Sequence, residues 1–194
     1  NENLAKVNLS DTAAFSDFIR QEIERQRARI GAGGYAENRI IYNSHIFTSA
    51  AEPRTLHLGT DIWAPAGTQV AAPISGRVHS FANNAAYRDF GPTVILEHNL
   101  EENRFYTLYG HLSKASLSHL YKGKNIPAGT VFAAIGAEDE NVQWPPHLHF
   151  QVITDVLGRE GDFFGVAPIS QKEYFLSLCP NPNLILRIKE LENL

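Results

Sequence analysis

Short β-rich runs separated by turn residues fill the middle of the chain, from residue 39 to residue 152. The runs are rich in valine, isoleucine, threonine and aromatic residues, and glycine, proline or asparagine stands between them. This pattern is typical of an all-β domain built from short strands. The string Pro-Ala-Gly-Thr occurs at 65–68 and again at 127–130, each time before a run that ends at glycine. The repeat suggests a duplicated β unit.

An amphipathic helix is expected ahead of the β-rich region. Ser10 and Asp11 are suited to cap its N-terminus, and apolar residues then recur at roughly helical spacing. We expect about five turns, ended by the glycines at 31–34. After Ile153 the chain reads as a loop with a short helix through 170–178.

These signals divide the chain into three parts. An N-terminal helical segment packed on the core would take residues 1–38, the β domain 39–154, and a C-terminal extension 155–194. The total of 194 residues suits one substantial domain of this kind.

Charge and composition exclude several partners. The formal net charge is −4 and the basic residues form no patch, which argues against nucleic acid and anionic membrane as partners. No apolar run approaches the roughly 20 residues of a membrane span. The N-terminal stretch lacks the apolar segment of a signal peptide. A single cysteine, Cys179, excludes an internal disulfide, so a cytoplasmic setting is favoured over a periplasmic or extracellular one.

Two histidines stand one residue apart in the apolar segment 145–152, which reads Pro-Pro-His-Leu-His-Phe-Gln-Val. In a strand, residues i and i+2 point to the same side, roughly 6.6 Å apart. His147 and His149 would therefore share a face. That spacing suits one metal ligand and one neighbour that acts on whatever the metal holds. The alternative is a pair of core or surface histidines with ordinary hydrogen bonds.

A further histidine and an aspartate lie upstream. His57 and Asp61 can reach one ion if the backbone between them turns, and Gly59 permits such a turn. Zinc accepts imidazole nitrogen and carboxylate oxygen, and a catalytic zinc keeps three protein ligands and one open position. With one histidine of the downstream pair, these residues would complete such a set. Taken singly, His57 reads as a turn histidine and Asp61 as a capping carboxylate.

The remaining histidines carry less information. His111 ends a strand within Leu-Tyr-Gly-His-Leu, at 108–112, and has no assigned role on its own. The others lack a partner motif and read as structural: His45, His79, His98 and His119.

The ordered set of His-x-x-x-Asp, Tyr-x-His and His-x-His resembles the lysostaphin-type zinc metallopeptidases, also called LytM-like peptidoglycan endopeptidases. The resemblance covers about residues 56–153. It implies a compact antiparallel β sandwich, a barrel–sandwich hybrid of the duplicated-hybrid-motif type. It also implies a zinc-dependent metalloendopeptidase that cuts an amide bond in a peptide or peptidoglycan-like substrate with a metal-activated water.

The resemblance also implies roles for single residues. His57, Asp61 and His149 would bind one zinc ion per chain. His111 and His147 would be the catalytic histidines that do not bind the metal. We assign His147 mainly to the general-base role and His111 mainly to transition-state stabilisation, a division that the sequence leaves open.

Two loops depart from the family pattern. Residues 83–92 and 137–146 replace glycine-rich segments with bulkier ones, and such loops decide what fits at a site. A non-hydrolytic binding or regulatory module of the same fold, within a multidomain cytoplasmic protein, is therefore the alternative function. The segment 161–186 resembles the tail of a peptidase-like domain found between kinase-like and aminotransferase-like domains in fused proteins, so neighbouring domains fused to this one are expected.

Overall fold

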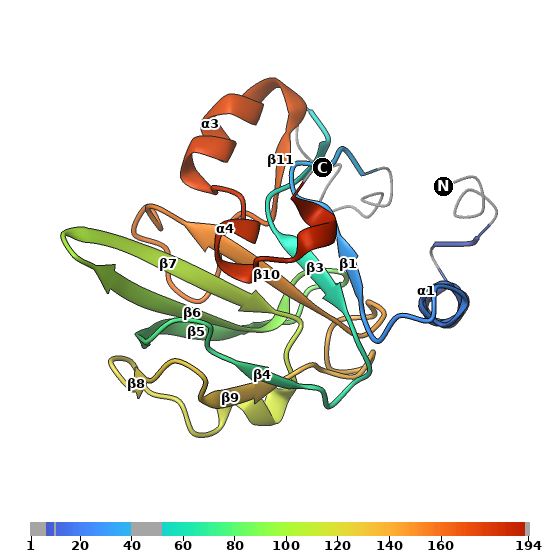
Figure 1. Ribbon diagram of the computed structural model, residues 1–194, viewed down its shortest axis with the longest axis horizontal. Coiled ribbons are helices and arrows are strands. Elements are labelled where there is room, and N and C mark those ends of the chain that lie inside the picture. The colour runs from blue at the N-terminus through green and yellow to red at the C-terminus, as the bar shows by residue number, and fades with distance from the viewer. Residues whose placement is uncertain (1–6, 10, 40–51, 193–194) are drawn as a thin grey trace.

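A computed structural model describes residues 7–9, 11–39 and 52–192 of the chain. Its main element is a seven-stranded antiparallel sheet, which confirms the mainly β prediction (Figure 1). Within the described residues the sheet does not close into a barrel. In spatial order its strands are β1 (Gly31–Gly33), β3 (Thr60–Trp63), β10 (His147–Ile153), β7 (Asn103–Gly110), β6 (Gly91–Leu100), β5 (Gly76–Asn84) and β8 (Asn125–Ile126).

Two small sheets accompany the large one. Strand β2 (Arg54–His57) pairs with β11 (Val166–Pro168), and β4 (Gln69–Ala71) pairs with β9 (Val131–Ala134). Strands β4 and β9 each follow one copy of the repeated Pro-Ala-Gly-Thr string, and they are antiparallel partners. The two repeated segments therefore contact each other directly.

The large sheet is buried on both faces. Consecutive residues of a strand point to opposite faces, and on β6 Val94 and Leu96 belong to one apolar cluster while Ile95 belongs to another. The first cluster includes residues of β4 and β9, and the second includes residues of β2, β11 and α3 (Lys172–Leu178). Figure 1 shows β4 and β9 on one side of the sheet and α3 on the other.

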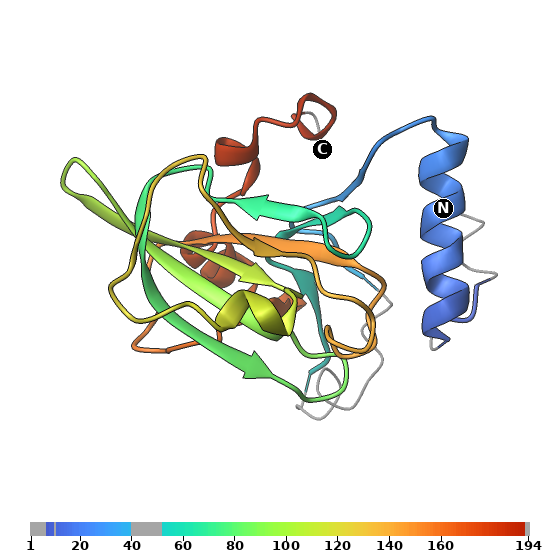
Figure 2. The same cartoon turned by 90° about the horizontal axis from the view of Figure 1, so that it is seen from below.

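Helix α1 (Thr12–Arg25) begins as expected, because Asp11 Oδ1 accepts a hydrogen bond from the backbone N–H of Ala14 at 3.0 Å. It is shorter than the five turns predicted. Arg27 adopts a left-handed conformation (φ 51°), which ends the helix before the glycines are reached. Gly31 and Gly33 instead lie in β1, which pairs with β3. In Figure 2, α1 stands beside the sheet.

The C-terminal extension contains the short helix that the sequence predicts, as α3. The other short elements are η2 (Lys114–Leu117), η3 (Ile169–Gln171), α4 (Asn183–Leu186) and η4 (Lys189–Leu191). No helix among the described residues is long and apolar enough to cross a membrane. His45 and the start of the expected β-rich region, residues 40–51, lie outside the described residues. The three-part division of the chain stays a prediction.

Candidate metal centre

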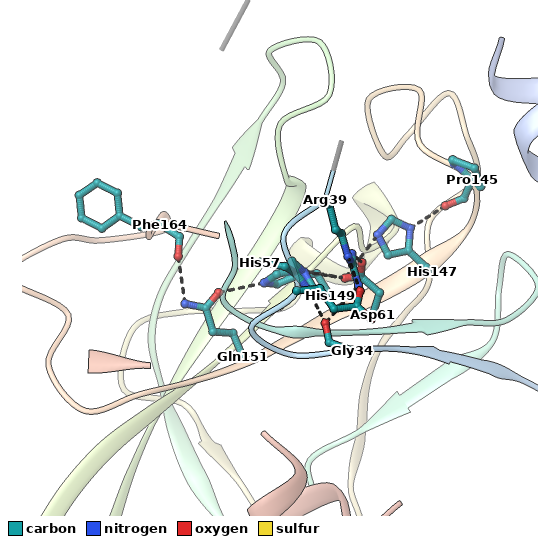
Figure 3. A network of polar contacts seen from close by, with 10 residues as sticks. Gly34, Arg39, His57, Asp61, Pro145, His147, His149, Gln151 and Phe164 are labelled. Carbon is teal, nitrogen blue, oxygen red and sulfur yellow. Dashed lines mark hydrogen bonds and ion pairs between the residues drawn. The ribbon is translucent and has the colours of Figure 1, made fainter. Parts of the chain in front are cut away.

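Strand pairing brings the predicted site residues together. In the β3–β10 pair, His149 stands opposite Asp61, and His147 stands opposite Trp63. On the other side of β10, His149 stands opposite Gly110 of β7, which directly precedes His111. The shared face predicted for the two β10 histidines is thus next to Asp61. His57, at the end of β2, completes the group that Figure 3 shows in part.

Three donor atoms converge at the centre of this group. His57 Nε2 lies 3.1 Å from His149 Nδ1, and Asp61 Oδ1 lies 3.1 Å from His149 Nδ1 and 3.3 Å from His57 Nε2. Ligand atoms bound tetrahedrally to zinc at 2.0–2.2 Å are about 3.3 Å or slightly more from one another. The three atoms therefore form a triangle close in size to one face of a zinc tetrahedron, and these residues could hold a metal ion.

Hydrogen bonds on the far side of each ring fix where the protons are. His57 Nδ1 donates to the carbonyl oxygen of Gly34 at 3.1 Å, and His149 Nε2 donates to Gln151 Oε1 at 2.9 Å (Figure 3). The Gln151 amide is oriented by its own donation to the Phe164 carbonyl at 3.0 Å. Both inward-facing nitrogens are thus lone pairs, directed at each other and at a carboxylate oxygen. Three lone-pair atoms at this spacing repel one another unless a cation lies between them. These three ligand atoms therefore fit a metal ion.

Gly59 lies in a bend between β2 and β3, where a turn was predicted, and it also supplies space at the centre. Its backbone is not left-handed. A Cβ at this position would lie 2.5 Å from His149 Nε2 and 2.9 Å from the carbonyl oxygen of Phe150. Glycine is needed because β10 and the His149 ring approach the backbone here.

Charge states in the centre favour metal binding. Burial opposes ionisation of Asp61, but His57 and the Arg39 guanidinium, which forms an ion pair with Asp61 Oδ2, hold the pKa of that carboxyl well below its usual value. Burial lowers the pKa of His57 to about 4 and also lowers the pKa of His147. His57 is therefore a neutral imidazole and Asp61 a carboxylate at neutral pH, the forms that bind metals.

The two histidines outside the triangle are also held in place. His147 Nδ1 donates to the carbonyl oxygen of Pro145 at 2.7 Å, and its Nε2 lies 3.8 Å from Asp61 Oδ1. Trp63 stacks on the His147 ring at a centroid distance of 4.2 Å. His111 lies on the other side, also with its centroid 4.2 Å from that of His147.

His111 has an unusual backbone and no hydrogen-bonded side-chain partner in the described part of the chain. Its φ of 60° is left-handed, a conformation that costs a non-glycine residue about 1–2 kcal/mol and persists where neighbouring structure holds it. Backbone hydrogen bonds from His111 N to Phe90 O (2.8 Å) and from Gly136 N to His111 O (2.9 Å) hold it there. Its Nδ1 is buried and unpartnered among the described residues.

A pocket of about 190 Å³ opens beside these groups, and Asp61, His111, His147 and His149 line it. The two loops that depart from the family pattern contribute to its walls through Arg88, Asp89, Phe90 and Trp144. Residues between 159 and 166 and Arg54, at the start of β2, also line it. The loops 83–92 and 137–146 thus form part of the wall of the pocket and do not fill it.

Comparison with known proteins identifies the family. Residues 55–160 match the model of peptidase family M23. The chain belongs to this family. The predicted lysostaphin-type resemblance is confirmed. The match gives no support to flanking kinase-like and aminotransferase-like domains, which stay a prediction.

Several solved structures are similar to this chain. A zinc-containing peptidase from Vibrio cholerae is 32% identical over 50% of this chain and 27% of that one, with a TM-score of 0.42. A catalytic-domain mutant of the prophage-encoded M23 protein EnpA from Enterococcus faecalis is 20% identical (69% and 88% covered, TM-score 0.46). The catalytic domain of the antimicrobial peptidase lysostaphin from Staphylococcus simulans is 20% identical (77% and 93% covered, TM-score 0.45). No curated protein matches the chain.

Sequence reasoning missed two residues of the centre, Arg39 and Gln151. Gln151 stands two residues after His149 on the same strand, and the i, i+2 rule that grouped the histidines could have added it. Arg39 lies outside the three motifs, so no local signal identifies it. Of the remaining histidines, His98 is structural as predicted, since its ring is buried and lies 2.7 Å from Thr107 Oγ1 and 3.0 Å from the carbonyl oxygen of Ser75.

Proposed function

We propose that the chain is a zinc-dependent metalloendopeptidase in which His57, Asp61 and His149 hold one zinc ion. The observation that carries the proposal is the triangle of two imidazole lone pairs and one carboxylate oxygen beside a pocket. A bound zinc would polarise the substrate carbonyl and lower the pKa of a water molecule. Two neutral imidazoles and one carboxylate leave the site with a net charge of about +1, which suits both effects.

His147 is suited to act as the general base. Its Nδ1–H is held by the carbonyl oxygen of Pro145, so its Nε2 lone pair faces the centre. It can take a proton from the attacking water at Nε2 and return it to the leaving amine. The carbonyl at Nδ1 and the nearby Asp61 carboxylate both stabilise the imidazolium that exists between these two transfers.

His111 is suited to stabilise negative charge that develops on the substrate oxygen. Its imidazole lines the pocket beside His147 and makes no side-chain hydrogen bond to any residue that the structure describes. A donor with no competing partner is available to the transition state. Its strained backbone is consistent with a position fixed for function.

Arg39 and Gln151 position the ligands. The ion pair between Arg39 and Asp61 Oδ2 leaves Oδ1 as the ligand oxygen. The Gln151 amide holds the proton of His149 on Nε2 and leaves Nδ1 for the metal. Hydrogen bonds of this kind commonly tune metal affinity.

The substrate class that the family resemblance supports is a peptide of the peptidoglycan type. Membership of family M23 supports peptide-bond hydrolysis, and the pocket is large enough for part of a peptide chain. The three-part division of the chain and the cytoplasmic setting remain proposals that accompany this function.

Metal content and hydrolysis test the proposal together. Protein purified without chelator or a histidine tag should contain about one zinc per chain, and His149→Ala should lose it. His119→Ala, a change at an exposed histidine outside the site, is the matched control and should keep the metal. The loaded protein should cleave peptidoglycan, oligoglycine or small peptide amides. Failure to take up added zinc would refute the proposal, and zinc binding without any hydrolysis would favour the non-hydrolytic module.

A further inference from the structure

Arg88 lies in the wall of the pocket, in the loop between β5 and β6. Only 2% of its surface is exposed. The guanidinium packs over the ring of Trp144, with Cζ 4.5 Å from the ring centroid, and its Nη2 donates to the carbonyl oxygen of Leu9. A backbone hydrogen bond to the carbonyl oxygen of Val142 (3.0 Å) fixes the loop that carries it.

This buried cation lacks a counter-charge in the described part of the chain. Its Nε and Nη1 are buried without a hydrogen-bond partner among those residues, so three of its N–H groups are unmatched. No described carboxylate forms an ion pair with it. Besides Asp61, two carboxylates line the pocket, and both have other partners. Asp162 pairs with Arg159 at 3.1 Å, and Asp89 accepts from the backbone N–H of Phe90 at 2.7 Å.

The missing partner is an acceptor. Asn141, on the facing loop, also has a buried Nδ2 without a partner in the described residues, so both unmatched side chains at this loop junction are donors. A buried charge without a partner is costly, and a cation–π contact offsets only part of that cost. A planar carboxylate is the group that a guanidinium binds best among those a peptide can offer.

The position relates this cation to the reacting groups. Arg88, His111 and His147 all lie near the ring of Trp144: Arg88 Cζ is 4.5 Å from its centroid, and the ring centroids of His111 and His147 are 6.3 and 6.4 Å from it. Arg88, His111 and His147 line the same pocket, so the part of a substrate that binds there would carry its charge close to the bond being cut.

We propose that Arg88 determines specificity by binding a carboxylate of the substrate close to the scissile bond, and that the enzyme prefers peptides with such a group. This inference rests on the proposed peptidase function. The carboxylate is either the free C-terminus of a short peptide or an acidic side chain next to the bond. Hydrogen bonds to a charged group suggest a preference of about 10-fold to 100-fold over the uncharged analogue.

Matched substrate pairs test this proposal. One pair would have the same peptide as C-terminal acid and C-terminal amide, and the other would have an internal glutamate or glutamine beside the bond. The wild type should show a higher kcat/KM for the acid in one of the pairs, which identifies the source of the carboxylate. Arg88→Gln should abolish that preference. Arg88→Lys, which keeps the charge, should retain part of it.

Arg159→Gln is the matched control, because it removes another arginine of the same pocket that already has a carboxylate partner. It should keep the preference. Absence of a preference in both pairs, or its persistence in Arg88→Gln, would overturn the proposal. Binding of the acid and amide forms of a product peptide to chelator-treated protein, measured by NMR titration, distinguishes failure of the carboxylate site from failure of the proposed peptidase function. A preference for the acid there supports the carboxylate site even if no peptide is hydrolysed, and equal binding refutes it.

Discussion

Replacing Gln151 with leucine should weaken zinc binding without removing any metal ligand. The Gln151 side chain is fully buried. It accepts from His149 Nε2 (2.9 Å), donates to the Phe164 carbonyl (3.0 Å) and contacts Cys179 Sγ (3.2 Å). Leucine is similar in size but offers neither donor nor acceptor, so the His149 N–H and the Phe164 carbonyl lose their partners.

The magnitude follows from the two groups left unpaired. Each buried polar group without a partner costs about 1–3 kcal/mol, so Gln151→Leu should lower the free energy of unfolding by about 2–6 kcal/mol. In the metal-free protein, His149 can recover part of this by moving its proton to Nδ1 and donating to Asp61. Metal binding forbids that tautomer, so zinc affinity should fall by about 10-fold to 100-fold.

Chelator competition measures the affinity, and urea unfolding with chelator present measures the stability of the metal-free protein. Gln151→Glu keeps an acceptor for His149 and should bind zinc much more tightly than Gln151→Leu. Cys179→Ala removes the sulfur contact alone and should leave the affinity unchanged. Wild-type affinity in Gln151→Leu would show that this amide does not hold the His149 tautomer.

Three further changes test other parts of the argument. Gly59→Ala should displace the His149 ring and lower both zinc affinity and unfolding free energy, whereas Gly31→Ala, whose added Cβ would meet nothing closer than 3.4 Å, should have little effect on zinc binding. His147→Ala should keep zinc, measured by metal analysis, and lose most turnover, and loss of the metal would mean that the two β10 histidines are assigned the wrong way round. Burial lowers the pKa of His98 in the folded protein, so the unfolded chain takes up a proton first as pH falls below about 6.5, and unfolding free energy should decrease there. Urea titrations at pH 7 and 5 should show a smaller decrease in His98→Gln, and an identical decrease would exclude this contribution.

The strand class was predictable because short β-rich runs and turn residues are local features. The neighbourhood of the two β10 histidines followed from the two-residue period of a strand. Helix α1 was predicted too long, since the apolar period continues past Arg25 while the left-handed backbone of Arg27 is not visible in the pattern. The glycines of β1 read as a helix stop because glycine is a weak strand former, and only pairing with β3 makes them a strand.

The part of the centre that could not be predicted depends on contacts between distant segments. Arg39 reaches Asp61 through tertiary packing, and no spacing rule connects them. The sequence indicated the bend at Gly59 but not the close approach of the His149 ring, which becomes evident only when β10 lies beside β3. The burial of Arg88 likewise depends on the meeting of two loops, 83–92 and 137–146, that are far apart in the chain.

The division of labour between strands and loops has a consequence for protein engineering. Asp61, His147 and His149 belong to paired strands inside the sheet, whereas Arg88 and Trp144 come from loops at its end. Transplanting these two loops from another member of the family should redirect the selectivity of the scaffold while the metal donors keep their register. A library that randomises only the loops would then sample new selectivities while the strands that carry the metal donors stay unchanged.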